Sequence, residues 1–498
     1  MKRTVYVRCD AGTRLGMGHL VRCLSLSHMI RNYFNVQFVL QETDATAYEW
    51  VLSNGFTYLT LPATTHHESD SANFIIKLSK SGQPGDLVVL DGYQFQTSYQ
   101  KKLVDAGYKV VAIDDLHSWH HAAHLVINHA PGISPQHYDI ANNTRLLLGS
   151  AYALLRPEIL KAASEHREIR PVQSAIISMG ASDADNCTLF FAEILAEHFP
   201  ALHIHLLVSS INPHLNALHQ FSEDHCNTTS LHINLTTSEL VKLLQSADAV
   251  ICPASTISLE ACATGCSIIT GYTADNQLGI LAGLTSVAAA ISLGCFQTLN
   301  PKSTRQQIKS FVEDLSLRQE QYQHQRALID AKSRFRLALH MLEISRSASH
   351  RKATLEDVQL LFAWANDAAV RANSFQSEPI VWENHVQWYS KALETAAIAI
   401  WIYSINNLPA AQIRLKVEDN TATINYSVAS NFRGQGLGTW LLQHICLLVK
   451  IENPRIQHLQ GWVKKENIGS VKAFERSGFI IAEDLEDRLL FKFQLDML

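Results

Sequence analysis

Residues 4–30, TVYVRCDAGTRLGMGHLVRCLSLSHMI, decide the first part of the fold. The apolar run at 4–10 predicts a buried strand, the glycines from 12 to 18 predict a turn, and the apolar spacing from residue 19 onward predicts a helix. A strand, a glycine-rich turn and a helix in this order are typical of an α/β unit. The glycines let the backbone approach a phosphate or sugar closely, and the helix N-terminus offers unpaired N–H groups to an anion.

The same alternation continues outward from this unit, and a second series follows a charged stretch, KAASEHREIRP, at 161–171. The further apolar runs of the first series are VQFVLQ (36–41), DLVVLDGY (86–93), KVVAID (109–114) and HLVINH (124–129). Those of the second are SAIISMGAS (174–182), ALHIHLLVS (201–209), SADAVICPAS (246–255) and CSIITGYTA (266–274). The pattern predicts an α/β protein with two tandem Rossmann-like domains, whose strands end at a cleft where ligands of such sheets bind.

A different pattern starts near residue 351. Residues 303–347 are polar and helical in pattern, which predicts closing helices and a linker. Beyond them come a helical stretch, three strands, a glycine-rich turn and a second alternation of helix and strand, which together predict an α+β domain. The expected domains are therefore 1–155, 156–345 and 350–498.

Composition excludes several classes of protein. The chain has 498 residues, 47% of them hydrophobic, and a formal net charge of −5. That charge gives no general attraction for nucleic acid or an anionic membrane, so we expect neither as a partner. The N-terminus lacks the apolar core of a signal peptide, and no apolar run is long enough to span a membrane. The nine cysteines are scattered, and we expect them to be buried thiols. These features together predict a cytoplasmic enzyme.

His19 is the best candidate for a general base. It lies where the glycine turn, which includes Gly16 and Gly18, meets the predicted helix. An imidazole titrates near neutral pH, so it can accept a proton from a reacting group. An isolated histidine would more often cap or pack at a turn, but the adjacent glycines favour a site here.

The second series offers groups suited to a nucleotide diphosphate. Two segments, MGASDADN and PASTISLEAC, place hydroxyls and a glycine between a strand and a helix, where a pyrophosphate can bind. A carboxylate on the second helix can accept the ribose hydroxyls, and the following TADNQ can contact the sugar. The candidate residues are Gly180, Ser182, Asp183, Ser255, Thr256, Glu260, Asn276 and Gln277.

A family resemblance rests on seven motifs in order: GMGHLVRCL, DGYQF, AIDDLHSWHH, LLGSAYALLRPE, MGASDADN, PASTISLEAC and TADNQ. The N-terminal 300 or so residues resemble the UDP-2,4-diacetamido-2,4,6-trideoxy-β-L-altropyranose hydrolases of pseudaminic acid biosynthesis. The resemblance implies a glycosyltransferase B-like fold and a metal-independent, inverting hydrolysis with His19 as the catalytic histidine. It also implies that Tyr93 faces the active site, and that Glu260 and Asn276 hold the nucleotide and substrate.

The chain departs from that family at two motifs. It has Asp91-Gly92-Tyr93 where the family has Asp-His-Tyr, and Gly180-Ala181 where the family has two glycines. Neither change removes a candidate catalytic group. A cluster of histidines at 117–124 has no recognisable ligand spacing, and we expect it to be structural or at the surface rather than a metal site.

A third site is predicted after the strand at 422–429. The segment NFRGQGLGTW opens an apolar helix, and its successive N–H groups can cradle a pyrophosphate because glycines leave the approach open. KKENIGSVKAFERSGF follows at the spacing of a GNAT N-acetyltransferase, which residues 351–498 resemble. The resemblance implies acetyl-CoA as co-substrate, bound by Arg433, Gly434, Gln435, Gly436, Gly438, Asn467 and Ser470.

The stretch before that site resembles the sugar-nucleotide branch of the GNAT superfamily. Trp364, Asn366, Asp367, Arg371, His385 and Trp388 match the 4-amino-sugar acetyltransferase of the same pathway. Many GNAT enzymes have a tyrosine acid where this chain has Phe474, so the acid is another group, a water or Tyr426.

The two resemblances predict consecutive reactions: N-acetylation of UDP-4-amino-4,6-dideoxy-L-AltNAc, then hydrolysis of the product to free sugar and UDP. Several alternatives stay open. One is that the N-terminal part is a glycosyltransferase of the same fold, and a second is that it is a non-catalytic UDP-sugar binding module. A third is that the C-terminal domain acetylates protein N-termini. A different acyl group or a related diamino-sugar pathway is also open.

Overall fold

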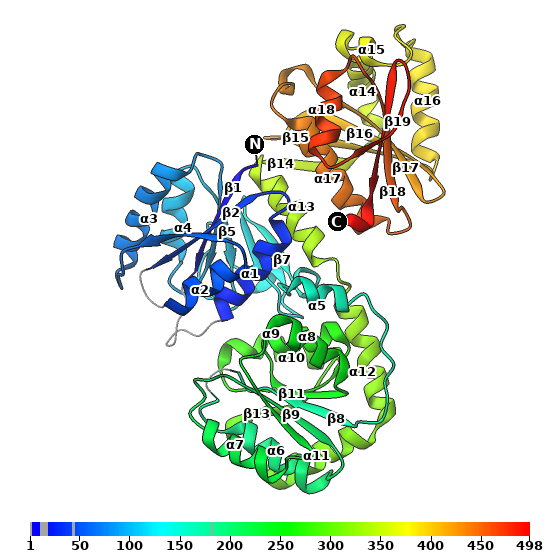
Figure 1. The fold of residues 1–498 in the computed structure, drawn as a ribbon. Helices are drawn as coiled ribbons and strands as arrows, with labels where there is room; N and C mark the ends of the chain where they lie inside the picture. Colours follow the sequence, from blue (N-terminus) through cyan, green and yellow to red (C-terminus); the bar gives the residue numbers. More distant parts are fainter. Residues whose placement is uncertain (1, 10–17, 42–44, 181–182) are drawn as a thin grey trace. The chain divides into compact units, whose positions relative to one another are not determined.

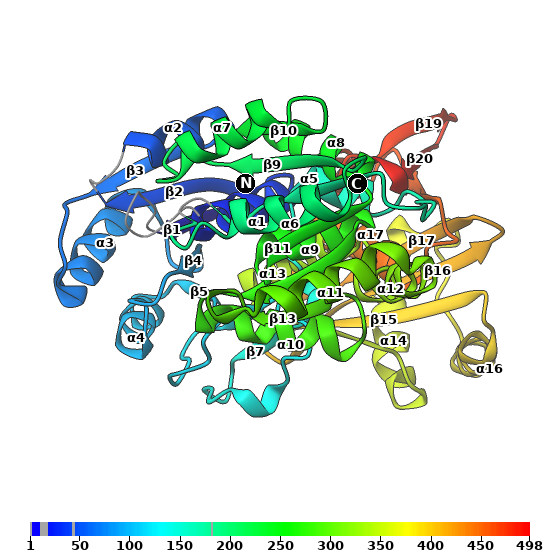
Figure 2. The same cartoon turned by 90° about the horizontal axis from the view of Figure 1, so that it is seen from below.

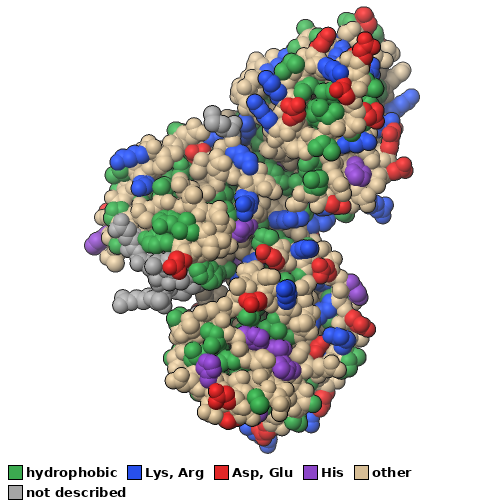
Figure 3. All heavy atoms as spheres, viewed as in Figure 1, with side chains coloured by type: hydrophobic (Ala, Val, Ile, Leu, Met, Phe, Trp, Pro, Cys, Tyr) green, Lys and Arg blue, Asp and Glu red, His purple; other side chains and the backbone are tan. Residues whose placement is uncertain are grey.

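The computed structural model describes residues 2–9, 18–41, 45–180 and 183–498. The chain divides into two compact units, Met1–Leu337 and Ala338–Leu498. This division falls inside one helix, α13, whereas the sequence places the boundary near residues 345–350; the three domain limits stay predictions. On the face drawn in Figure 3, positive and negative side chains are interspersed over both units.

The first sheet is parallel, with the strand order β3-β2-β1-β4-β5-β6-β7. Its strands are β1 (Thr4–Cys9), β2 (Asn35–Gln41), β3 (Thr57–Leu61), β4 (Leu87–Asp91), β5 (Lys109–Ile113), β6 (Leu125–Asn128) and β7 (Arg145–Leu148). The helices that accompany it are α1 (Gly18–Ile30), α2 (Ala45–Ser53), α3 (His67–Ser81) and α4 (Thr97–Asp105), whereas α5 (Pro157–Ala162) packs mainly against helices of the second sheet. Figure 1 shows α3 and α4 beside the strands. Their apolar side chains share a core with the sheet, because both faces of a parallel sheet must be covered.

The second sheet is also parallel, in the order β10-β9-β8-β11-β12-β13. Its strands are β8 (Ser174–Ile177), β9 (His203–Val208), β10 (Thr229–Ile233), β11 (Ala249–Pro253), β12 (Ser267–Tyr272) and β13 (Ile291–Cys295). Its helices are α6 (Cys187–His198), α7 (Leu215–Asp224), α8 (Thr237–Ser246), α9 (Thr256–Thr264), α10 (Leu278–Ser286), α11 (Pro301–Glu313) and α12 (Leu315–Leu328). Figure 1 shows α6, α7 and α11 on one face, where they form a common core with the strands, and α8, α9 and α10 on the other.

Both sheets have the doubly wound order in which a ligand site is expected. In the first, the chain leaves β1 toward β2 on one side and returns to β4 on the other. In the second, β8 is flanked in the same way by β9 and β11. Ligands of such sheets bind beyond the carboxyl ends of the strands at this switch point. The predicted α/β class with two Rossmann-like sheets is confirmed.

The C-terminal unit is a mixed sheet in the order β14-β15-β16-β17-β18-β20-β19. Helix α13 (Ser333–Ser345) leads into it. Its strands are β14 (Ala348–Lys352), β15 (Ile398–Ile405), β16 (Leu408–Glu418), β17 (Thr421–Val428), β18 (His458–Lys464), β19 (Ile480–Asp484) and β20 (Arg488–Gln494). Its helices are α14 (Val358–Ala365), α15 (Ala368–Asn373), α16 (Trp382–Glu394), α17 (Leu437–Glu452) and α18 (Ile468–Arg476). Figures 1 and 2 show α14 and α16 together beside strands β15–β17.

Two further findings concern the whole chain. Seven of the nine cysteines are buried and all nine are free thiols, whereas Cys226 is exposed and Cys295 is partly exposed. In the part of the chain that the structure describes, no helix is long and apolar enough to cross a membrane.

Candidate active sites

A histidine and an aspartate are in contact at the start of α1. His19 lies on the first turn of α1, and Asp91 ends β4, where it is the register partner of Cys9 at the end of β1. The Nδ1 atom of His19 lies 2.6 Å from Oδ1 of Asp91. A carboxylate at this distance accepts the Nδ1 proton and leaves the Nε2 lone pair as the basic atom of the ring.

Arg22, one turn after His19, keeps that carboxylate ionised. Its Nε and Nη2 atoms each donate to Asp91 at 2.6 Å, and its Nη1 donates to Asp115 at 2.9 Å. Burial opposes ionisation of the fully buried Asp91, but the charges of Arg22 and His19 outweigh it and hold the pKa of Asp91 at about 2. Asp91 therefore stays an acceptor for His19 at all physiological pH values.

Asp91 should also make stability depend on pH. Because its folded pKa lies below the unfolded value of ~3.9, it contributes stability above pH ~4 that is lost as pH falls through about 2. We expect a loss of about 2 kcal/mol in the free energy of unfolding over that interval. Asp91→Asn should remove this part of the acid slope in denaturant titrations at several pH values. Substitution of the exposed Asp105 by Asn should leave the slope as it is; equal slopes in both variants would contradict the assignment.

Tyr93 and Asn276 meet beside His19. The Tyr93 ring stands edge-on to the His19 ring with 5.1 Å between centroids, and the Asn276 side-chain amide donates to the Tyr93 hydroxyl at 3.1 Å. Burial raises the pKa of Tyr93, so its hydroxyl stays protonated. The two residues come from the β4 end and from the turn after β12. The structure thus brings together three residues that the sequence singled out separately.

The other predicted nucleotide contacts have mixed surroundings. Gly180 has a φ of +88°, which a glycine adopts without strain. Asp183 is 7% exposed and caps α6, because its carboxylate accepts from the N–H groups of Cys187 at 2.8 Å and Thr188 at 3.0 Å. That fits the helix-cap interpretation and leaves little for a phosphate, which a carboxylate would repel. Gly16 and Ser182 lie outside the described residues, and Gly18 is the first residue of α1.

The segment around α9 keeps its hydroxyls accessible. Ser255 is the N-cap residue of α9 and Thr256 its first residue, and both are partly exposed. Glu260 is 1% exposed and its Oε1 lies 3.0 Å from Nε of Arg156, so contact with a ribose would require uncovering it. The side-chain oxygen of Gln277 accepts from the N–H of Thr273 at 2.8 Å and holds the turn. Nucleotide contacts of these residues stay predictions.

The histidine cluster at 117–124 is built into the fold. His124 accepts the N–H of Val110 at 3.1 Å, and His120 lies 2.9 Å from Asp139. His121 is fully buried and lies beside the rings of Trp119 and Tyr138. These contacts support the structural interpretation.

The C-terminal unit contains a cavity of about 1030 Å³ where two parallel strands separate. Strands β17 and β18 pair from Thr421–His458 to Thr423–Gln460. Beyond that point residues 424–428 and 462–464 no longer pair with each other and line the cavity. The cavity therefore opens where the hydrogen bonding between β17 and β18 ends.

The glycine loop before α17 forms one wall of this cavity. Gly434 and Gly436 have φ of +76° and +72°, and Gly436 is the N-cap residue of α17. An added Cβ at Gly438 would lie 3.2 Å from the Tyr426 hydroxyl, so a side chain there would crowd the wall. Arg433 lines the same wall, donating to Val428 O at 2.9 Å and to Asp367 at 2.7 Å. Backbone N–H groups at such a loop suit a pyrophosphate.

The remaining predicted residues sit on α18 and in the loop. Asn467 caps α18 by accepting from the Ser470 N–H at 3.1 Å. Both line the cavity, as do the predicted loop residues other than Gln435, whose side chain donates to Asn431 O at 3.1 Å. The structure thus gathers almost the whole predicted acetyl-CoA set around one cavity.

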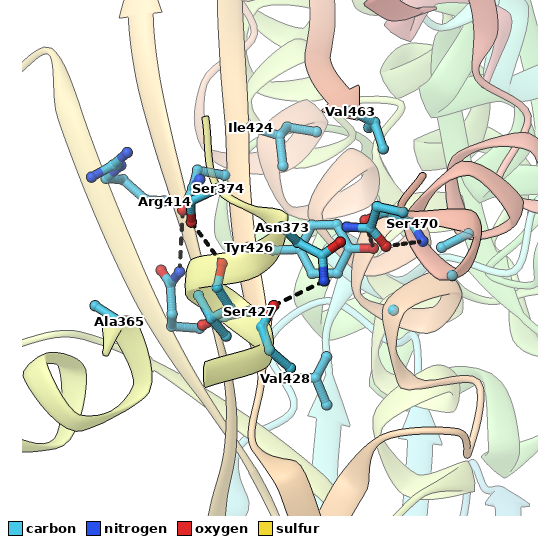
Figure 4. Close-up of a pocket in the computed structure, with 18 of the residues that line it drawn as sticks. Ala365, Asn373, Ser374, Arg414, Ile424, Tyr426, Ser427, Val428, Val463 and Ser470 are labelled. Carbon is cyan, nitrogen blue, oxygen red and sulfur yellow. Dashed lines mark hydrogen bonds between the residues drawn. The ribbon is translucent and has the colours of Figure 1, made fainter. Parts of the chain in front are cut away.

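Tyr426 contributes a phenol hydroxyl to the lining of this cavity. Its oxygen lies 2.7 Å from the Ser470 hydroxyl, as Figure 4 shows, and burial raises the pKa of Tyr426 so that it holds its proton. Phe474 is 2% exposed and packs against Phe479 and Phe491. Of the two positions considered from sequence, Tyr426 therefore carries a transferable proton and Phe474 does not.

The opposite wall carries a cation and a histidine. The Arg414 guanidinium lies 4.9 Å from the Trp388 ring centroid, and the described contacts of the C-terminal unit include no carboxylate paired with it. Burial lowers the pKa of Arg414. His385 is 3% exposed, and its Nε2 has no hydrogen-bond partner among the described residues. This wall offers charge and hydrogen bonding to a polar, anionic ligand.

Sequence reasoning missed Asp91, Arg22 and Asp115 as site residues, and Arg414 as well. A signal existed for two of them: Asp91 ends a buried strand two residues before the selected Tyr93, and Arg22 stands three residues after His19, on the same helix face. Nothing local marks Asp115 or Arg414.

Comparison with known proteins identifies the C-terminal domain. Residues 350–480 match the family described as acetyltransferase (GNAT) domain. The chain therefore carries a GNAT acetyltransferase domain at its C-terminal end, which confirms the resemblance at the level of the domain.

Two relatives extend the likeness to the rest of the chain. An uncharacterized protein of Methanocaldococcus jannaschii is 22% identical over 484 residues, which cover 94% of this chain and 95% of that protein. Spore coat polysaccharide biosynthesis protein SpsG of Bacillus subtilis is 22% identical over 339 residues, which cover 67% of this chain and 96% of that protein. Among solved structures, Acinetobacter baumannii MurG is similar with a TM-score of 0.48 and 12% identity, covering 66% of this chain and 95% of that one.

Proposed function

We propose that the protein is a bifunctional enzyme of UDP-sugar metabolism. The GNAT domain transfers acetyl from acetyl-CoA to the 4-amino group of UDP-4-amino-4,6-dideoxy-L-AltNAc. The N-terminal unit then hydrolyses UDP-2,4-diacetamido-2,4,6-trideoxy-β-L-altropyranose to the free sugar and UDP. The observation that carries the hydrolase is the 2.6 Å contact of His19 with the buried, ionised Asp91 at the switch point of the first sheet.

The hydrolysis follows from that pair. The Nε2 atom of His19 accepts a proton from a water as its oxygen attacks the anomeric carbon, and the bond from that carbon to the UDP oxygen breaks. Asp91 stabilises the imidazolium that forms. UDP leaves as an anion, and the N-terminus of α9 with Ser255 and Thr256 suits its phosphates. Attack opposite the leaving group inverts the anomeric centre.

The acetyl transfer uses the cavity between β17 and β18. The glycine loop and the start of α17 bind the CoA pyrophosphate. The sugar amine attacks the thioester carbonyl, the bond from carbon to sulfur breaks, and Tyr426 donates its proton to the CoA sulfur. The proton lost by the amine passes to solvent.

Two comparisons support a carbohydrate pathway and the fusion. The name of the Bacillus subtilis relative refers to polysaccharide biosynthesis, and that protein aligns with about the N-terminal two thirds of this chain. The Methanocaldococcus jannaschii relative spans nearly the whole chain, so both parts occur together in a second protein. Consecutive reactions give such a fusion a rationale.

The test is a coupled assay with purified full-length protein, acetyl-CoA and the UDP-4-amino sugar, followed by NMR and mass spectrometry. We expect CoA, UDP and free 2,4-diacetamido sugar to appear, with acetylation preceding UDP release. CoA without UDP would overturn the hydrolase and leave a glycosyltransferase or a binding module. UDP release from a pre-acetylated substrate without CoA formation from the amine would overturn the proposed acetyl acceptor.

Arg414 should matter for the anionic acceptor and not for acetyl-CoA. A charge-assisted hydrogen bond of about 1.5–3 kcal/mol predicts that Arg414→Gln raises the KM for the UDP-amino sugar by about 10–100-fold. The KM for acetyl-CoA should change little. Lys416→Gln is the matched control, since Lys416 lies two residues further along β16 and pairs with Glu418 at the surface. Equal KM changes for both substrates would contradict the assignment.

A further inference from the structure

A cluster of histidines surrounds a buried glutamate in the C-terminal unit, outside the residues that line the acetyl-transfer cavity. Glu343 lies on α13, His350 on β14 and His444 on α17. The Oε1 atom of Glu343 is 2.6 Å from Nδ1 of His350 and 3.4 Å from Nε2 of His444. One ligand atom from each of the three residues lies within 4.8 Å of the others. Three separate elements thus converge on one point.

Each ring presents a suitable nitrogen to that point. Nδ1 of His444 lies 3.1 Å from the Tyr403 hydroxyl, so the outer nitrogen of the ring is occupied and Nε2 faces Glu343. Metal-ligating histidines usually bond their second nitrogen to such an outer partner, which fixes tautomer and orientation. The arrangement therefore has ligand atoms and a supporting residue.

The cluster is buried. Glu343 and His444 are 2% and 0% exposed. A carboxylate together with imidazole nitrogens is a donor set that zinc prefers.

We propose that Glu343, His350 and His444 bind one Zn²⁺ that fastens α13 to the GNAT domain. Ligand atoms at ~2.0–2.1 Å from zinc in a tetrahedron lie ~3.4 Å apart, close to the contact of His444 with Glu343. His350 must withdraw by less than an ångström, on the order of a rotamer adjustment. His340, whose Nδ1 is 3.3 Å from the second oxygen of Glu343, takes the fourth position. A site closed by protein ligands is structural.

The experiment measures zinc on untagged full-length protein. After loading with Zn²⁺ and dialysis, metal content is determined by mass spectrometry, affinity by competition with a chromophoric chelator, and geometry by the visible absorption of the Co²⁺ form. We expect one equivalent of zinc, tetrahedral Co²⁺ absorption, and a melting temperature that falls when a chelator removes the metal.

Variants separate this site from other histidines. His350→Gln, at a partly exposed position, should lose stoichiometric zinc. Tyr403→Phe keeps all ligands and should weaken zinc binding by about 10–100-fold. His120→Gln, at an exposed histidine paired with Asp139, should bind as the parent does.

Two results would overturn the proposal. One is a parent protein that binds no more zinc than His350→Gln, which would leave a hydrogen-bonded network only. The other is zinc lost from His205→Gln but kept by His350→Gln. That would move the site to the group of His203, His205 and His232 on β9 and β10, whose members contact one another. Figure 3 shows histidines gathered on the visible face of that region.

Discussion

His19→Gln is expected to lower the rate of UDP release by about 10²–10⁴-fold, with CoA release unchanged. Glutamine can still donate a hydrogen bond to Asp91, so the buried Asp91–Arg22 pair keeps its partners. It has no basic nitrogen, however, and water would have to lose its proton without help. The effect should fall on kcat more than on KM, because the base acts in the transition state.

The measurement follows UDP by a coupled assay and CoA by thiol titration in one reaction. His28→Gln is the matched control, because His28 lies on the same helix and contacts Asn54 rather than Asp91. The pH profile is the second measurement: the part of the pH dependence that belongs to the general base should disappear in His19→Gln. Unchanged UDP release in His19→Gln would contradict the catalytic role of His19 and favour the binding-module alternative.

Tyr426→Phe should lower kcat for CoA formation by about 10²–10⁴-fold, with UDP release from pre-acetylated substrate unaffected. The proposed role of the phenol is to protonate the departing sulfur, and burial raises the pKa of Tyr426 so that the proton is present at neutral pH. The ring centroids of Tyr426 and Phe474 lie 6.2 Å apart. Phenylalanine keeps the ring of Tyr426, so the packing of the wall is preserved.

The control is Tyr389→Phe. Tyr389 is a fully buried tyrosine of the same domain whose hydroxyl donates to Thr354 O at 2.6 Å. It should lose some stability but keep activity. Acetyl-CoA affinity, measured by calorimetry, should be similar in both variants. Normal CoA formation in Tyr426→Phe would show that water protonates the sulfur, the other possibility that the sequence left open.

Much of the architecture was predictable because its signals are local. Alternating apolar runs and helical stretches indicated two parallel sheets, since a strand buried on both faces has a continuous apolar sequence. The turn at Gly434–Gly438 indicated an anion-binding helix start because glycine reaches positive φ without strain. Gln435 was the one member of the acetyl-CoA set whose position on the loop did not bring it to the cavity.

Other features depend on which strands become neighbours. Asp91 is 72 residues from His19 in the chain, and the pairing of β1 with β4 brings them together. Glu343 and His444 are 101 residues apart and meet because α13 lies against α17, where the Trp440 ring N–H donates to Leu342 O. Arg414 lines a cavity that exists only where β17 and β18 separate. No local pattern encodes such distances, because they are set by packing between elements.

The sequence by itself determined the elements, the two classes of domain and the glycine turns, since periodicity and backbone freedom act over a few residues. Tertiary structure alone decided which side chains became partners. It assigned Asp91 and Arg22 to His19, buried Glu260 against Arg156, and assembled the histidines around Glu343. The physical reason is that burial and charge pairing depend on neighbours in space, and those neighbours are fixed only once the strands and helices have packed together.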